Sequence, residues 1–423
     1  MANKHPYHVD GEVGRFDFIT HSVRLENDTR YNTARDVFPR LNGKEFYRTT
    51  GFKEIAIIYG DTEDSFRKTT KLINRMRCQE QGGTPYRTLQ EATEREGAKL
   101  LDFVKEKSKR VLIRHSFTEE AQYKESGQID EGSLPVTMSS EQVKEQLDEM
   151  RLPEAVDVSE VLANPVGYEA SQHAAMISID DVTPKRQEET RVKGGRQDEP
   201  KRKYVHNTII HIESTGKKYT LSALGLKTAL CFLTAFLLSN GLKFKRFQFF
   251  TDGHTTLIDT ILKMFAWKSN IGMILDWYHL SKKCKERLSL ALKGRHARNQ
   301  ILREIMPLLW NGLTQRAIDM LNAVEVKNIK SKEHIDKLIQ YLERNRRYIP
   351  CYALRKRLGL RNSSSIGEKM NDLIVSQRQK HNGMSWSKEG SSALAAITAL
   401  KRNKESSKWF DQGTIAFKLD QAA

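Results

Sequence analysis

Two short apolar runs in this chain each end in an aspartate. The run FQFFT precedes Asp252, and the run GMIL precedes Asp276. Both runs are typical of buried strands in a parallel sheet, because such strands are nearly continuous hydrophobic segments. The carboxyl ends of these strands form the rim of a sheet where ligands bind, so we expect both carboxylates at that rim. Acids in this position favour a metal site, since Mg²⁺ takes oxygen ligands.

A third apolar run, AAMISI, leads into Asp180 and Asp181. Period-two and period-3.6 patterns in the following residues predict a hairpin, a buried helix, the strand before Asp252, a second helix and the strand before Asp276. The hairpin and helices are expected at 204–213 with 218–226, at 228–238 and at 254–266. The predicted order is three strands, helix, strand, helix, strand and helix, which is an α/β fold.

The flanking segments differ from this core in pattern and charge. Residues 1–50 show no clear period and are expected to form an N-terminal arm, and residues 51–115 contain three helical segments. Residues 116–170 form an acidic linker or helical lobe, in which Ser139 and Gln142 predict a helix start. After the predicted core at 171–280, an all-helical insertion at 281–362 is expected, followed by the C-terminal part of the core and a tail at 363–423.

The chain is strongly basic. Its 70 Lys and Arg against 53 Asp and Glu give a formal net charge of +17, a charge that attracts a polyanion such as DNA or RNA. Solvated lysine faces are the simpler explanation. The three helices at 51–115 fit a helix-turn-helix-like DNA-binding domain, although a small bundle that packs on the next domain has the same pattern. The basic residues that would touch DNA are Arg67, Lys68, Lys71, Arg75 and Arg77.

The four cysteines are scattered and include no CxxC pair. Neither a disulfide framework nor a thiolate zinc site is therefore predicted, as is typical of a cytoplasmic protein. The longest apolar stretch, 228–238, is too short for a membrane span. No membrane partner is expected.

The segment 363–387, SSSIGEKMNDLIVSQRQKHNGMSWS, resembles the third-acid helix of bacterial insertion-sequence DDE transposases. The strand order, with acids after the first and fourth strands, resembles the RNase H-like catalytic domain of the same family. The resemblance covers about 174–400. It assigns the third acid to Glu368, helix basic residues to Arg378 and Lys380, and a closing element to Gly383, Met384 and Trp386.

The resemblance implies a metal-dependent DNA transposase. Asp180, Asp252 and Glu368 would be both the catalytic residues and the metal ligands, with Asp180 between two Mg²⁺ (or Mn²⁺) ions. Such ions serve the attacking and the leaving oxygen of phosphodiester cleavage together. The enzyme would bind terminal inverted repeats, cut the transposon ends and join them to target DNA. A homodimer or a larger synaptic assembly is expected, located in the bacterial cytoplasm with the nucleoid.

Two departures from the family pattern leave alternatives open. The family usually has a glycine after its first aspartate, and here Asp181 follows, so the first acid is either Asp180 or Asp181. The turn SSSIGE lacks the usual glycine between serines. Taken singly, Asp252 with Gly253 also fits an ordinary turn, Glu368 the end of a capping box, and Asp180 a loop start. Their joint placement is what favours catalysis.

The neighbouring residues have similar alternatives. Asp276 fits a helix cap and His279 a core histidine, or both support the metal site or a DNA end. Lys282 and Lys283 would contact DNA phosphates or form a solvated face. Trp386 would stack on an unpaired base or pack in the core.

Three hypotheses follow. The first is an active DDE transposase. The second is a catalytically inactive, transposase-derived DNA-binding protein, and the third is a metal-dependent host nuclease or resolvase.

Overall fold

The computed structural model divides the chain into two compact units. Unit 1 comprises Met1–Lys105, Val182–Asn207 and Asp372–Phe417, and unit 2 comprises Glu106–Asp181, Thr208–Asn371 and Lys418–Ala423. The predicted segment 363–423 is therefore divided between the units. The structure describes residues 3–24, 30–32, 46–62, 65–79, 83–125, 127, 129, 138–150, 158–163, 167–187, 204–269, 271–381 and 383–419. Much of the predicted arm (25–29 and 33–45) and of the acidic lobe (130–137 and 151–157) lies outside these residues.

Unit 2 is built on a five-stranded sheet with the strand order β7-β6-β5-β8-β9. The strands are β5 (Ala174–Val182), β6 (Asn207–Ser214), β7 (Lys217–Leu224), β8 (Arg246–Thr251) and β9 (Ile271–Leu275). Strands β5, β8 and β9 run parallel. Strands β6 and β7 form a hairpin whose two-residue turn has positive φ at both positions, the geometry of a tight hairpin turn. The protein thus has a mixed α/β fold with a mixed sheet.

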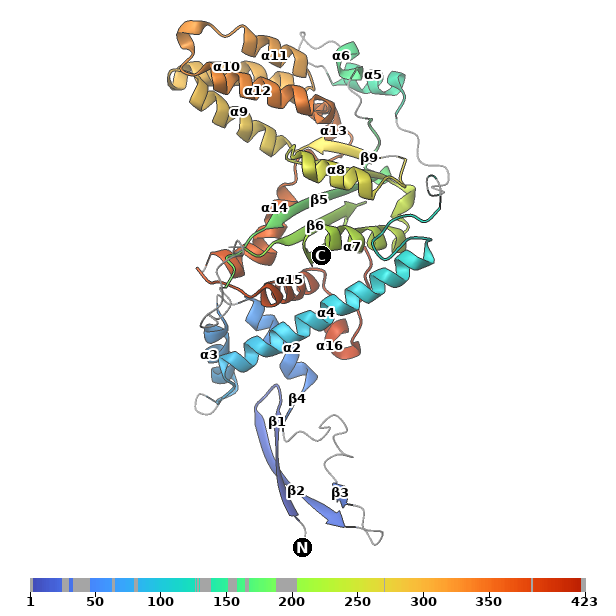
Figure 1. Cartoon of the computed structure of the whole chain (residues 1–423), viewed down its shortest axis with the longest axis vertical. Coiled ribbons are helices and arrows are strands. Elements are labelled where there is room, and N and C mark those ends of the chain that lie inside the picture. The colour runs from blue at the N-terminus through green and yellow to red at the C-terminus, as the bar shows by residue number, and fades with distance from the viewer. Residues whose placement is uncertain are drawn as a thin grey trace, which may run out of the picture. The chain divides into compact units, whose positions relative to one another are not determined.

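Helices alternate with the later strands of unit 2 in the predicted order. Helix α7 (Leu226–Ser239) contains the apolar segment and buries most of it, α8 (Thr255–Met264) follows β8, and α9 (Trp277–Ala291) follows β9. The residues of β8 and β9 are almost all buried, because their apolar side chains alternate between two covered faces. Figure 1 shows α7 and α8 beside this sheet.

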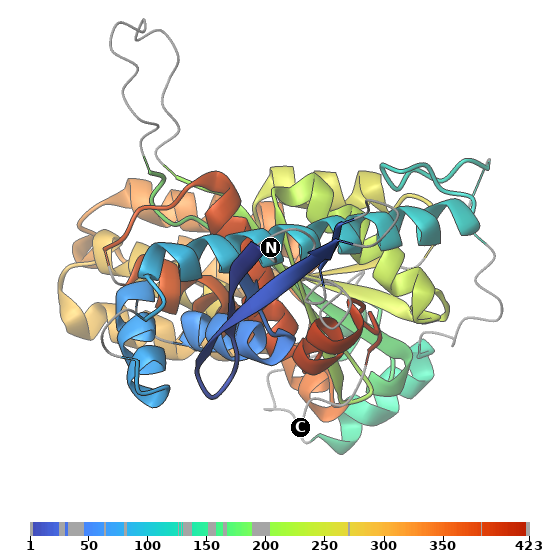
Figure 2. The same cartoon turned by 90° about the horizontal axis from the view of Figure 1, so that it is seen from below.

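The predicted all-helical insertion is observed. It contains α9, α10 (Gly294–Trp310), α11 (Thr314–Asn322), α12 (Lys332–Asn345) and α13 (Tyr352–Arg357). Helices α9 to α12 pack on one another and form a single group in both views (Figures 1 and 2). The chain then enters α14 (Ser365–Asn371). Two further helices precede the sheet, α5 (Ser140–Glu149) and α6 (Val158–Leu162), and α5 begins with the predicted capping box of Ser139 and Gln142.

Unit 1 contains the three predicted N-terminal helices, α2 (Thr50–Thr62), α3 (Phe66–Met76) and α4 (Tyr86–Arg114), of which the last continues into unit 2. It also contains strands that the sequence pattern did not reveal: β1 (Asn3–Asp10), β2 (Arg15–Arg24), β3 (Arg30–Asn32) and β4 (Phe46–Arg48). The β1–β2 pair is antiparallel, and its dark blue ribbon is clear in Figure 2. Within β2, charged and aromatic residues alternate only over Arg15–Phe18, and the expectation of an arm without a clear period overlooked this short period-two signal.

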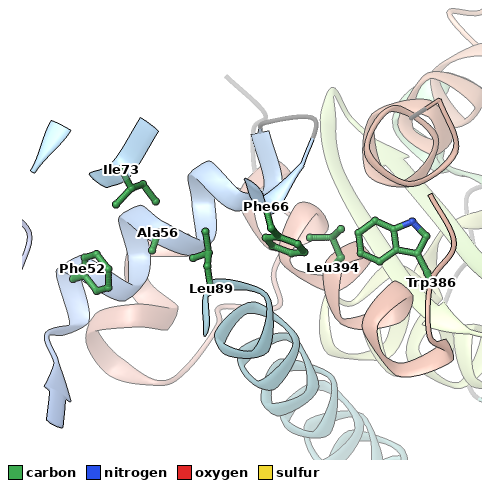
Figure 3. Close-up of a cluster of buried hydrophobic side chains, with 7 residues drawn as sticks. All are labelled: Phe52, Ala56, Phe66, Ile73, Leu89, Trp386 and Leu394. Carbon is green, nitrogen blue, oxygen red and sulfur yellow. The ribbon is translucent and has the colours of Figure 1, made fainter. Parts of the chain in front are cut away.

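The C-terminal elements of unit 1 complete its core. These are the π-helix η6 (Asp372–Lys380), α15 (Lys388–Arg402) and α16 (Ser406–Gln412). Figure 3 shows Trp386 and Leu394 from this part in one cluster with Phe52, Phe66 and Leu89 from the N-terminal helices. Among the helices of the described residues, none combines the length and the apolar character needed to cross a membrane.

Candidate functional site

The three predicted acids line one pocket of about 330 Å³ in unit 2, which we call the acid pocket. Asp180 lies near the end of β5, Asp252 directly follows β8, and Glu368 lies in the first turn of α14. Because β5 and β8 are parallel neighbours, their carboxyl ends meet at one edge of the sheet. Other polar residues that line the pocket include Asp181, Asp276, His279 and Asn371.

Asp180 is held by two hydrogen bonds. Its Oδ1 accepts from the Asp181 amide at 2.8 Å, and its Oδ2 accepts from Asn371 Nδ2 at 2.6 Å. The side chain reaches solvent, but the surrounding protein displaces much of its water. This desolvation, together with the negative charges of Asp181, Asp252 and Glu368, raises the pKa of Asp180 to about 6, since each factor disfavours the ionised form.

Asp181 also lines the pocket, but its side chain has a different hydrogen-bond partner. Its Oδ1 accepts from Thr208 Oγ1 on β6 at 2.5 Å. Adjacent residues of a strand point to opposite faces of the sheet. Asp180 is the one of the two that bonds to Asn371 of α14, the helix that carries Glu368, which favours Asp180 as the first acid.

The loop of Asp252 is fixed by the helical insertion. The Asp252 side chain accepts from the His254 amide at 2.9 Å, so the predicted turn is present. Tyr341 of α12 donates to the Asp252 carbonyl at 3.2 Å. Gly253 has a φ of +89°, and a Cβ at this position would lie 2.8 Å from Asn345 Oδ1 of α12. Only glycine fits both constraints without strain, so the backbone beside Asp252 has little freedom.

Glu368 reaches the pocket because α14 lies very close to β5. A Cβ on Gly367 would lie 2.7 Å from the Ser178 Cβ, so the glycine permits this approach. Glu368 Oε1 lies 2.8 Å from His279 Nε2. Desolvation and the charge of Asp276 raise the pKa of Glu368, while His279 and Lys282 act in the opposite direction.

Asp276 has the predicted structural role. It is 2% exposed and caps α9, accepting from the amides of Tyr278 (2.7 Å) and His279 (3.1 Å). Its other carboxylate oxygen accepts from the Ser364 amide. Asp276 therefore joins the start of α9 to the segment that leads into α14, and this fixes His279 opposite Glu368.

A buried arginine positions the same segment, and sequence reasoning missed it. Arg355 is fully buried, and its Nη2 donates to Gln248 Oε1 (2.9 Å) and to the Arg361 carbonyl (2.6 Å). Its Nε donates to Asn362 Oδ1 at 3.2 Å. Arg361 in turn forms a two-pronged pair with Glu213 of β6. Gln248 lies 107 residues from Arg355, and Glu213 lies 148 residues from Arg361, so no local signal marks these two contacts.

Asn371 was also missed, although a signal for it exists. It follows Glu368 by three residues on a helix, and this spacing places two side chains on one helix face. An amide side chain there suits a hydrogen bond to a neighbouring acid. The observed bond from Asn371 to Asp180 shows that α14 contributes a second polar side chain to the pocket beside Glu368.

The residues predicted to bind DNA have diverse environments. On α3, Arg67, Lys71 and Arg75 are exposed, and Lys380 and Lys282 are also exposed, while Lys283 is half-buried with its ammonium group over the Tyr341 ring. Arg77 is buried and pairs with Asp10 at 2.9 Å.

Arg378 and Trp386 require a correction, because both are buried in unit 1 rather than placed on its surface. Arg378 donates to the Gly60 carbonyl and lies over the Phe66 and Trp386 rings. Trp386 thus follows the core-packing alternative. The aromatic faces hold the guanidinium in the interior through cation–π contacts.

The donor chemistry of the acid pocket suits a divalent cation. Asp180, Asp252 and Glu368 supply carboxylate oxygens, and their mutual repulsion is what a bound cation relieves. Glu368 forms a hydrogen bond with His279. In the described part of the chain, no three Asp, Glu, His or Cys side chains lie close enough together to hold a metal ion in their present positions. Side chains of the pocket would therefore have to move before three carboxylates could hold one ion.

We compared the chain with models of protein families, with curated proteins and with solved structures, and none of them matches it.

Proposed function

We propose that the protein is a metal-dependent DNA transposase of the DDE type, which binds the terminal inverted repeats of an insertion sequence, cleaves its ends and transfers them to target DNA. One observation carries this proposal: Asp180, Asp252 and Glu368, spread over nearly 190 residues of sequence, line one pocket. A chance gathering of three acids is costly, because like charges raise one another's pKa.

The sheet supports an RNase H-like assignment of the core. The element order is that of the sequence resemblance, three strands followed by alternating helices and strands. The strand order places the first strand, β5, beside the fourth, β8, so the two aspartates at their ends share one rim. The helices of 281–362 lie between the last strand and the third acid, where the helical period of the sequence predicted an insertion.

Five residues of the pocket have a role in this proposal. Bound Mg²⁺ or Mn²⁺, expected as two ions, would polarise the scissile phosphate and activate the attacking oxygen. Asp180, Asp252 and Glu368 would supply the carboxylate oxygens that hold these ions. Asn371 orients Asp180, and His279 holds Glu368 at the pocket until the substrate is bound. The DNA phosphates would complete the ligand set.

The pairing of Glu368 with His279 also favours a second candidate, a catalytically inactive relative that binds DNA. In such a protein the histidine would keep the third acid from the metal site permanently. The two candidates share the fold and the basic charge, so only an assay of turnover separates them.

The test is a strand-transfer assay with the purified full chain, Mg²⁺ and DNA that carries the sequences flanking its gene. The transposase proposal predicts cleaved ends joined to target DNA with the wild type. It also predicts no joined product with Asp252→Asn, whose DNA affinity stays unchanged. Asp259→Asn, the same substitution at an exposed position of α8, should retain wild-type activity. DNA binding without transfer in every protein would instead favour the inactive relative.

A further inference from the structure

Most of the chain's net positive charge lies in the helical insertion. Residues 281–362 carry 20 Lys and Arg against 7 Asp and Glu, a net charge of +13 out of +17 for the whole chain. The insertion makes up only about a fifth of the sequence. The electrostatic attraction for a polyanion is therefore concentrated there.

Part of this charge lines a second pocket of about 590 Å³, which we call the basic pocket. Four cationic side chains line it: Lys293, Arg295, Arg298 and Lys330. The remaining lining residues are Ser289, Leu292 and Gly294, so no acid faces the cavity. None of the acid-pocket residues belongs to it.

The backbone around the basic pocket is fixed by a small antiparallel pairing. The Lys293 amide donates to the Asn328 carbonyl at 2.8 Å, and the Lys330 amide donates to the Ala291 carbonyl at 2.7 Å. A β-bridge joins Leu292 to Ile329 between them. These contacts hold the turn between α9 and α10 against the segment before α12, and so place Lys330 beside the other three cations.

Arg298 is oriented without being neutralised. Its Nε and Nη2 donate to Asn299 Oδ1 at 3.1 and 2.9 Å, and its Nη1 lies 3.3 Å from Ser289 Oγ. Within the described part of the chain, no carboxylate forms an ion pair with any of the four cations. Helix α10 also begins here, with no side-chain cap from Lys293, and its positive dipole end adds to the field.

We infer that the basic pocket binds the phosphate backbone of duplex DNA and anchors the substrate apart from the acid pocket. This inference rests on the proposed function, which supplies DNA as the partner. An arginine guanidinium can donate two parallel hydrogen bonds to phosphate oxygens. Four cations in one concave site can contact several consecutive backbone phosphates, which is more than a single small anion needs. Contacts of this kind fix the position of DNA without reading its sequence.

The test compares two triple variants of the full chain with equal loss of charge. Lys293→Gln, Arg295→Gln and Arg298→Gln remove three cations of the basic pocket. Arg303→Gln, Arg347→Gln and Lys356→Gln remove three exposed cations of the same insertion that do not line it. Binding to a random-sequence duplex is measured from about 50 to 200 mM salt, and thermal melting confirms that both variants are folded.

The inference predicts that the pocket variant binds about 10-fold or more weakly and has a shallower salt dependence. The slope of log K against log salt should fall by about 2 to 3, close to 0.9 for each lost phosphate contact. The control variant should change that slope by less than about 1. Equal slopes in the two variants would overturn the inference.

A second experiment uses inorganic phosphate, because a free phosphate ion presents the same oxygen acceptors as the DNA backbone. If phosphate raises the melting temperature of the wild type and not of the pocket variant, while both bind DNA equally, the site takes a small anion and the DNA inference is wrong. The strand-transfer assay tests the proposed enzyme activity separately. If the wild type transfers no strands but the pocket variant binds DNA more weakly than the wild type, the DNA-binding inference holds and the proposed enzyme activity is wrong.

Discussion

The acid pocket and the basic pocket are assembled in different ways. The acid pocket joins the ends of β5 and β8 to α14, and its carboxylates are held by hydrogen bonds from side chains such as Asn371 and His279. The basic pocket is formed by one turn and one nearby segment of the insertion, and three of its four cations are exposed. We conclude that substitutions in the acid pocket should change the rate of DNA cleavage and strand transfer. Substitutions in the basic pocket should change the affinity for DNA.

The largest expected effect is at the third acid. Glu368→Gln keeps the size of the side chain but removes a metal-binding charge, so we expect strand transfer to fall by about 10²–10³-fold. DNA affinity should stay within about twofold, because the basic pocket is intact. Glu343→Gln, at an exposed position of α12, is the matched control. A similar loss of activity in both variants would contradict the separation of roles.

Arginine-to-methionine substitutions compare the two regions directly. Arg355→Met leaves the buried acceptors of Gln248, Arg361 and Asn362 without their donor, and each unsatisfied acceptor costs about 1–3 kcal/mol, so the free energy of unfolding should fall by about 3–5 kcal/mol. Arg298→Met removes a cation of the basic pocket that no acid pairs with, and should cost about 1 kcal/mol or less. Urea unfolding measures both. Equal losses would mean that the two arginines are equally important to the fold.

The close approach of α14 to β5 gives a smaller effect. Gly367→Ala forces its Cβ against Ser178, which shifts α14 and moves Glu368 from the pocket. Because small displacements at a reactive site slow catalysis strongly, we expect strand transfer to fall about 10-fold. Adding Ser178→Gly should restore most of the activity by making room. No loss with Gly367→Ala, or no recovery in the double variant, would show that the contact does not position Glu368.

The smallest effect concerns the pH dependence of stability. The pKa of Asp180 is raised to about 6 in the folded protein from an ordinary 3.8. The folded state therefore binds more protons between these values, and the free energy of unfolding falls as the pH rises through them. Because the side chain reaches water, we expect a difference of about 1 kcal/mol.

The Asp180→Asn variant tests this pH dependence. The variant carries no titrating group at the position, so it should lose this part of the slope, as urea unfolding from about pH 4 to 7 would show. Parallel pH profiles for the wild type and the variant would show that Asp180 has an ordinary pKa.

Local sequence patterns predicted the frame of the acid pocket. The apolar runs before Asp180 and Asp252 indicated buried strands, and parallel strands bring their ends to one rim. The helical period of 281–362 likewise predicted the insertion. These features depend on neighbouring residues, and the sequence alone displays them.

The contacts that orient the pocket could not be predicted in the same way. Asn371 and Asp180 are separated by 191 residues, and Gln248 and Arg355 by 107, so no short-range pattern links them. The family resemblance implied a DNA contact for Arg378, and Trp386 was expected either to stack on an unpaired base or to pack in the core. The structure buries both, since Phe66 and Gly60 supply the ring and the carbonyl that an interior guanidinium requires.

The most direct test of the central claim is iron-mediated cleavage of the protein itself. Fe²⁺ replaces Mg²⁺ in the full chain, and ascorbate with peroxide produces hydroxyl radicals that cut the backbone beside the bound ion. The account predicts cuts near Asp180, Asp252 and Glu368 in the same sample, suppressed by excess Mg²⁺ and lost in Asp252→Asn. Cuts confined to one of these segments, or unchanged in Asp252→Asn, would contradict a shared metal site.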